Sequence, residues 1–169
     1  MYKEIEMIPN QVYSILLEDW DEEITGVFVT EGKEWILLLD NQNDFILEGL
    51  RFVNKARLDE VLRDDDEKFK EKVFSKKYSD FSLPNSYNLN DTAKLLQQIK
   101  EENKLLHFDM EDEEEIIVGL IENIYDDKFE LKALTSEAEW GENLISEFRE
   151  LSTLAIDNDY LKSLNLLID

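Results

Sequence analysis

The chain has 169 residues, of which 43% are hydrophobic and 11% aromatic, so it can form a packed core. Forty-one acidic against eighteen basic residues give a formal net charge of -23, which argues against direct nucleic-acid binding because phosphate contacts need clustered Lys or Arg. The chain has no cysteine, which excludes disulfides and thiolate nucleophiles. No apolar run approaches the roughly 18 residues of a membrane span, so we expect a cytoplasmic protein without a membrane partner.

The first half of the chain has the pattern of successive antiparallel strands. An apolar segment at 11–19 is followed by an acidic loop, by a strand through Gly26 and by the segment EWILLL at 34–39. A turn at 40–44 comes next, and a last strand lies near FVNKARLDEV. Short runs rich in Val, Ile, Phe and Trp that are separated by Asn, Asp and Gly predict such strands.

A helix is expected to close the first half. Phe69, Val73 and Phe74 lie at helical spacing, and Asp64 can cap the first turn. A competing interpretation is one long helix from Ala56 to Phe74, because its apolar residues nearly keep the same period.

A linker is predicted at 75–91, where Pro84 stands among small polar residues. Asn90 or Asp91 can then cap a second helix. The apolar residues of this helix are few, which indicates that one face packs on a sheet and the other faces water. They are Leu95, Leu96 and Ile99.

The second half repeats the order of the first. EDWDEEITG at 18–26 and EDEEEIIVG at 111–119 share five of nine positions, and an apolar segment at 104–112 corresponds to 11–19. KFELKAL at 128–134 corresponds to EWILLL, with Trp35 matched to Phe129. Two further matches continue the repeat, Gly49 with Gly141 and Arg57 with Arg149. These matches predict one structural unit used twice.

A final helix is expected from Tyr160, Leu161 and Leu164, with Asp157 or Asn158 as its cap. A glycine inside a strand often marks a sharp bend, and bent strands allow a small sheet to close into a barrel. Each half is therefore predicted to form a small barrel followed by a helix.

The order of these motifs resembles that of a widespread group of uncharacterised bacterial proteins with duplicated small Sm-like barrels. The resemblance implies a mainly β fold with two tandem Sm-like or Src-homology-3-like antiparallel barrels, joined by a linker and helix. It brings no catalytic or ligand motif. The expected domains are a first barrel with its helix at 1–78, the linker and helix at 79–103, and a second barrel with its helix at 104–169.

Catalytic and metal-binding chemistry has weak support in the sequence. His107 is the only histidine, and Asp109 shares its face if the segment is extended, but the counterpart of His107 in the first half is Ser14. The acidic runs lack the glycine that a calcium loop needs at its sixth position. We therefore expect no catalytic residue, no metal and no cofactor, and a His107–Asp109 pair is the enzyme interpretation that stays open.

Acidic clusters and two tryptophans are the candidate partner-binding residues. Trp20 lies within the first cluster and Trp140 follows Glu139. Aromatic side chains among carboxylates suit a surface that contacts a basic protein. In the alternative, the tryptophans pack over the ends of the barrels and the charge serves only solubility. The candidate residues are Asp19, Trp20, Asp21, Glu22, Asp109, Glu111, Asp112, Glu113, Glu114, Glu115 and Trp140.

The sequence thus favours a non-enzymatic acidic module that binds a basic protein partner. An immunity protein or inhibitor that covers a basic surface of a toxin or of a nucleic-acid-binding protein would be one example, because dense carboxylates can take the place of phosphates. The alternative is a structural or regulatory scaffold whose units pair with each other, or with another copy in a homo-oligomer, through strand edges.

Overall fold

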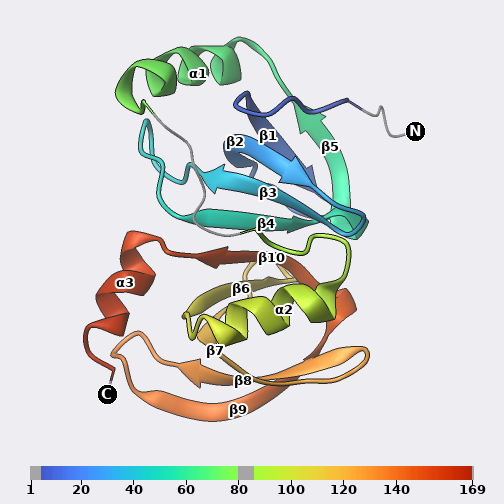
Figure 1. Ribbon diagram of the computed structural model, residues 1–169, viewed down its shortest axis with the longest axis vertical. Helices are drawn as coiled ribbons and strands as arrows, with labels where there is room; N and C mark the ends of the chain where they lie inside the picture. The colour runs from blue at the N-terminus through green and yellow to red at the C-terminus, as the bar shows by residue number, and fades with distance from the viewer. Residues whose placement is uncertain (1–4, 80–85, 169) are drawn as a thin grey trace.

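The computed structural model describes residues 5–79 and 86–168, and in these residues ten strands form one antiparallel sheet (Figure 1). The first unit contains β1 (Val12–Leu17), β2 (Ile24–Glu31), β3 (Trp35–Asp40), β4 (Leu50–Asn54) and β5 (Leu58–Leu62). The second contains β6 (Leu106–Met110), β7 (Ile116–Ile124), β8 (Lys128–Leu134), β9 (Trp140–Glu147) and β10 (Leu151–Ile156). The predicted mainly β, antiparallel character is confirmed.

Three α-helices accompany the sheet in the described part of the chain: α1 (Asp65–Lys77), α2 (Thr92–Glu101) and α3 (Asp159–Asn165). Their N-caps are Asp64, Asp91 and Asn158, as predicted. The cap side chains of α2 and α3 each accept a backbone N–H of the first turn. No helix in the described residues is long and apolar enough to cross a membrane.

The long helix from Ala56 to Phe74 is wrong. A 3₁₀ turn, η1 (Lys55–Arg57), is followed by β5, which pairs with β1, and α1 begins only after Asp64. The single last strand expected in each half is two strands, because η1 separates β4 from β5 and η2 (Phe148–Glu150) separates β9 from β10.

The buried faces of the helices agree in part with the expected ones. Leu95, Leu96 and Ile99 of α2 are all fully buried, as predicted. In α1, however, Phe74 is buried while Phe69 is 58% exposed, with its ring against that of Phe45 in the loop between β3 and β4. Residues 75–77 of the expected linker belong to α1, and its Pro84 lies outside the described residues.

The two units have the same strand pairing when 93 is added to each residue number of the first. Tyr13 opposite Gly26 in β1 and β2 becomes Leu106 opposite Gly119 in β6 and β7. The β-bulges recur as well: the β2 ladder shifts at Phe28–Thr30, and the β7 ladder shifts at the equivalent Ile121–Asn123. The repeat therefore extends to the register of the sheet.

This constant difference corrects three matches made from the sequence. It places Ile36, and not Trp35, with Phe129. It also places Gly49 with Glu142 and Arg57 with Glu150, one residue beyond the expected Gly141 and Arg149. Residue identity misled the alignment there, because strand pairing and not residue type sets the register. The match of Gly26 with Gly119 is confirmed.

Gly26 and Gly119 are needed because a neighbouring strand passes close to their backbones. A Cβ at Gly26 would lie 2.4 Å from the carbonyl oxygen of Leu39, and one at Gly119 would lie 2.4 Å from that of Lys132. Both distances are well inside van der Waals contact, so only glycine fits without a shift of the adjacent strand.

The two units are joined edge to edge. The strand order is β5-β1-β2-β3-β4-β10-β6-β7-β8-β9, so β4 and β10 lie side by side at the middle of the molecule (Figure 1). The largest buried apolar cluster draws on both units, including Phe52 of β4, Phe108 of β6 and Leu154 of β10. The sheet is open, with β5 and β9 as its ends, and the two closed barrels stay a prediction.

Candidate functional site

The two acidic loops predicted from the sequence meet at the junction of the units. Residues 18–23 connect β1 to β2, and residues 111–115 connect β6 to β7. The carboxylate of Glu113 accepts the backbone N–H groups of Asp21 and Glu22, both at 3.0 Å. The Trp20 indole donates to the carbonyl oxygen of Glu111 at 3.3 Å. We call these two loops together the acidic rim.

The contacts within the rim offset the repulsion between its charges. Hydrogen bonds from N–H groups to a carboxylate are stronger than those between neutral groups, which is how Glu113 can lie against the other acidic loop. Arg57, from η1, adds an ion pair with Glu111 at 3.4 Å. The rim is therefore built by specific contacts and is more than an accumulation of solvated side chains.

A hollow of about 410 Å³ is lined by residues of the rim, among them Trp20 and Glu113, and by strand residues of both units. Its charged lining is strongly acidic, with one arginine and the histidine His107 against five carboxylates. Neutral His107 leaves a formal excess of four negative charges in the lining. The five carboxylates are Glu22, Glu23, Asp40, Asp109 and Glu113.

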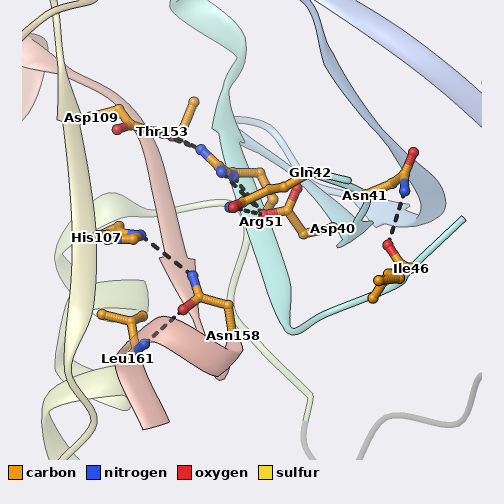
Figure 2. A network of polar contacts seen from close by, with 10 residues as sticks. All are labelled: Asp40, Asn41, Gln42, Ile46, Arg51, His107, Asp109, Thr153, Asn158 and Leu161. Atoms are coloured by element: carbon orange, nitrogen blue, oxygen red, sulfur yellow. Dashed lines mark hydrogen bonds and ion pairs between the residues drawn. The ribbon is translucent and has the colours of Figure 1, made fainter. Parts of the chain in front are cut away.

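Arg51 of β4 lines the hollow, and it bridges the two units through its polar contacts (Figure 2). Its guanidinium lies 3.1 Å from a carboxylate oxygen of Asp40 in β3 and 2.6 Å from one of Asp109 in β6. It also donates to the hydroxyl of Thr153 in β10 at 2.9 Å. We call Asp40, Arg51, Asp109 and Thr153 the junction cluster.

The junction cluster holds more negative than positive charge in a nearly dry setting. Arg51, Asp40 and Asp109 are all less than 9% exposed. Burial alone would lower the pKa of Arg51, but the charges of Asp40 and Asp109 outweigh it and hold that pKa above its ordinary value. The guanidinium therefore stays charged, and the cluster has two carboxyl groups for this one cation.

His107 lies on β6 with Asp109 and lines the same hollow, but its ring contacts the start of α3. Its ring stacks on Tyr160 of α3 at a centroid distance of 5.4 Å, and its Nδ1 lies 3.4 Å from the amide nitrogen of Asn158 (Figure 2). Asp109 is engaged by Arg51 and Thr153 instead. Burial lowers the pKa of His107 and the charge of Arg51 lowers it further, although Asp109 raises it.

The remaining predicted residues divide between the rim and a distant strand. Asp19, Asp112, Glu114 and Glu115 are exposed on the rim, where Asp112 accepts the N–H of Glu114 and shapes the loop. Trp140 lies elsewhere, on β9.

Trp140 packs beside a small apolar cluster that includes Leu134 and Leu161. The Lys132 ammonium lies 4.4 Å from its ring centroid. Trp140 does not line the hollow, so the structure separates it from the other candidates.

Sequence reasoning missed Glu23, Asp40 and Arg51. The signal that could reveal the last two is their difference from the other unit. The constant difference of 93 places Asp40 with Ala133 and Arg51 with Leu144, so charged residues stand where the second copy is apolar. Asp109 likewise corresponds to Leu16.

A second hollow, of about 730 Å³, has a balanced lining. Its basic residues are Lys33, Lys55 and Arg149, and its acidic residues include Glu34 and Asp126, with Asp91 as the third. With three charges of each sign it favours neither a cationic nor an anionic ligand. Of the two hollows, the one at the junction therefore indicates more about the charge of a ligand.

Metal ligation has no support in the described residues, among which no group of three or more His, Asp or Glu side chains is arranged to hold an ion. The junction site is best described as an anionic recess whose hydrogen-bond donors, such as the guanidinium of Arg51, already bind carboxylates of the recess.

Comparison of the chain with protein-family models, with curated proteins and with solved structures finds no match.

Proposed function

We propose that this protein is a non-enzymatic, cytoplasmic binding module for a basic protein partner, and that a lysine or arginine of the partner enters the hollow at the junction. An immunity protein or inhibitor that covers a basic surface of a toxin or of a nucleic-acid-binding protein is the concrete case. The observation that carries the proposal is the convergence of both acidic loops on one recess, with five carboxylates against one arginine.

The arrangement of carboxylates in the recess fits the binding of a basic side chain, and solubility alone would not require it. Charges that serve only solubility gain nothing from being gathered, because like charges repel. Here the Glu113 carboxylate holds the opposite loop in place, and Asp40 and Asp109 line the hollow around one guanidinium. An entering ammonium or guanidinium would neutralise the remaining charge in a partly desolvated site, where electrostatic attraction is stronger than on an open surface.

The fold supports the proposal in a second way. We propose that each unit is a small Sm-like barrel, and that duplication placed equivalent loops of the two barrels next to each other. The difference of 93 relates 18–22 to 111–115, so the two halves of the rim are copies of one loop. A duplicated loop doubles the local charge without a new structural element.

Binding of a decalysine peptide tests this proposal. Isothermal titration should give binding that weakens steeply with salt, because exposed charges are screened over about 10 Å at 0.1 M ionic strength. The double variant Glu22→Gln/Glu23→Gln should bind about tenfold more weakly, at roughly 0.7 kcal/mol for each charge removed.

The matched control is Glu137→Gln/Glu139→Gln, two exposed residues in the turn between β8 and β9. Both double variants change the net charge of -23 by the same two units. The control should bind decalysine within about twofold of the wild type. Equal weakening by both double variants would mean that the peptide responds to the overall charge, and the proposed recess would then be wrong.

A further inference from the structure

The chain already contains one complete junction between two units. In it, β4 and β10 pair antiparallel, with Phe52 opposite Leu154 and Arg51 opposite Ala155. β4 is the fourth strand of the first unit and β10 is the fifth strand of the second. The junction thus joins a fourth strand to a fifth.

The two end strands of the sheet are equivalent to the two strands that pair at this junction. The free strand at one end is β9, the fourth strand of the second unit, and the free strand at the other end is β5, the fifth strand of the first unit. The difference of 93 relates β9 to β4 and β10 to β5 throughout their registers. Each molecule therefore presents a fourth-strand edge and a fifth-strand edge.

Burial at equivalent positions marks β9 as an edge without its neighbour. Phe52 in β4 is fully buried, whereas its equivalent in β9, Ile145, is 60% exposed. Leu144 beside it is 38% exposed. Exposed apolar side chains on an unpaired strand are the feature that natural edge strands generally avoid.

We propose that β9 of one molecule pairs antiparallel with β5 of a second copy of this chain, in the register of the β4–β10 junction. Transferring that register by 93 residues places Ile145 opposite Val61 and Leu144 opposite Leu62 of the next copy. The contact is heterologous, because different edges meet, so repetition gives a closed ring or an open head-to-tail chain. This inference does not depend on the proposed function.

Charge sets the conditions for this association. In β10, Ser152 and Thr153 are fully buried, but their equivalents in β5 are Asp59 and Glu60, both exposed. Acidic residues on a free edge oppose pairing, and each copy carries a formal charge of -23. The association should therefore be weak at low salt and should strengthen as salt screens the repulsion.

Sedimentation of the full-length chain tests the proposal. At high salt, the apparent mass should rise with protein concentration above the 20.0 kDa of one chain. Ile145→Lys should weaken this association by about tenfold or more, because it places a charge at the centre of the contact. The control is Leu166→Lys, which adds the same charge at an 85% exposed position outside the sheet, and it should associate like the wild type.

Asp59→Ser/Glu60→Thr gives a gain-of-function test, since it copies Ser152 and Thr153 of β10 onto the free edge of β5. This variant should associate at lower salt than the wild type. A mass of one chain for both the wild type and this variant, at all concentrations and salts, would overturn the proposal. So would association that Ile145→Lys and Leu166→Lys affect equally.

Cysteine cross-linking checks the register, because the natural chain has no cysteine. A Leu62→Cys/Leu144→Cys variant should form disulfide-linked multimers under oxidising conditions, whereas Leu62→Cys/Glu137→Cys should not. Equal cross-linking of both would overturn the register. Salt separates this proposal from the preceding one, since decalysine binding should weaken with salt while self-association should strengthen.

Discussion

Replacing Arg51 by leucine should be among the most destabilising single changes in this protein. Leucine is the residue at the equivalent position of the second unit, Leu144. The loss is electrostatic: Arg51→Leu leaves Asp40 and Asp109 buried, 2% and 7% exposed, without their shared cation. Removing one partner of a buried ion pair typically costs about 3–5 kcal/mol.

The residues at equivalent positions of the repeat suggest a variant that should offset the loss of stability in Arg51→Leu. The equivalents of Asp40 and Asp109 are Ala133 and Leu16, so Asp40→Ala/Arg51→Leu/Asp109→Leu gives each of these three positions the apolar residue of its equivalent in the other unit. Replacing a whole buried ion cluster by apolar residues is often neutral or stabilising. The triple variant loses two further contacts, the Thr153 hydroxyl to Asp109 and the Gln42 amide to Asp40, each worth about 1 kcal/mol.

Urea unfolding followed by circular dichroism measures both variants. The single variant should lose about 3–5 kcal/mol of unfolding free energy, and the triple variant should recover most of this loss. The slope of free energy against urea should stay that of the wild type in both. A loss below about 1 kcal/mol in Arg51→Leu, or an equal loss in the triple variant, would refute the electrostatic account of the junction.

Two further predictions concern His107 and the glycines. Burial holds the pKa of His107 below its ordinary 6.5 in the folded protein, so the unfolded chain binds more protons as the pH falls through 6.5, and stability decreases until the folded-state pKa is passed. Since His107 is the only histidine, His107→Gln should remove this pH dependence of stability. The dependence amounts to at most about 1.4 kcal/mol per pH unit between pH 7.5 and 5.5. A pH profile of stability that is the same in the variant would contradict the assignment of this dependence to His107. Gly119→Ala should cost about 2–3 kcal/mol of stability, because its Cβ would lie 2.4 Å from a backbone oxygen. Gly141→Ala, whose Cβ would have its nearest neighbour at 3.7 Å, should change stability by less than about 1 kcal/mol. Equal losses of stability in thermal unfolding of the two variants would refute this difference.

Local signals predicted most of the elements. Asp91 and Asn158 cap helices because their side chains accept first-turn N–H groups, an interaction within three residues that the sequence shows directly. KFELKAL at 128–134 is β8 without any change of bounds. The acidic loops were also identified, because their composition and their glycines repeat.

These local signals could not predict which strands pair when they lie far apart in the sequence. The contacts of Glu113 with Asp21 and Glu22 join residues 92 and 91 positions apart, and they follow from the pairing of β4 with β10. Arg51 looks like one more charged residue of a strand until that pairing places it against Asp109. The long helix through 58–62 failed for the same reason, since pairing with β1 overrides helical periodicity.

The junction cluster also distinguishes the middle of the sheet from its ends. If β4 paired with β5 of another copy in the same register, Arg51 would meet Leu62, and Leu16 would stand where Asp109 now binds the guanidinium. Arg51 would then lose one of its two carboxylates in a buried setting, a cost of a few kcal/mol. A pairing of β9 with β5 places Leu144 there instead and leaves no charge unpaired at that position. The cluster therefore favours β4 with β10 within one chain, and leaves β9 and β5 as the edges that suit each other.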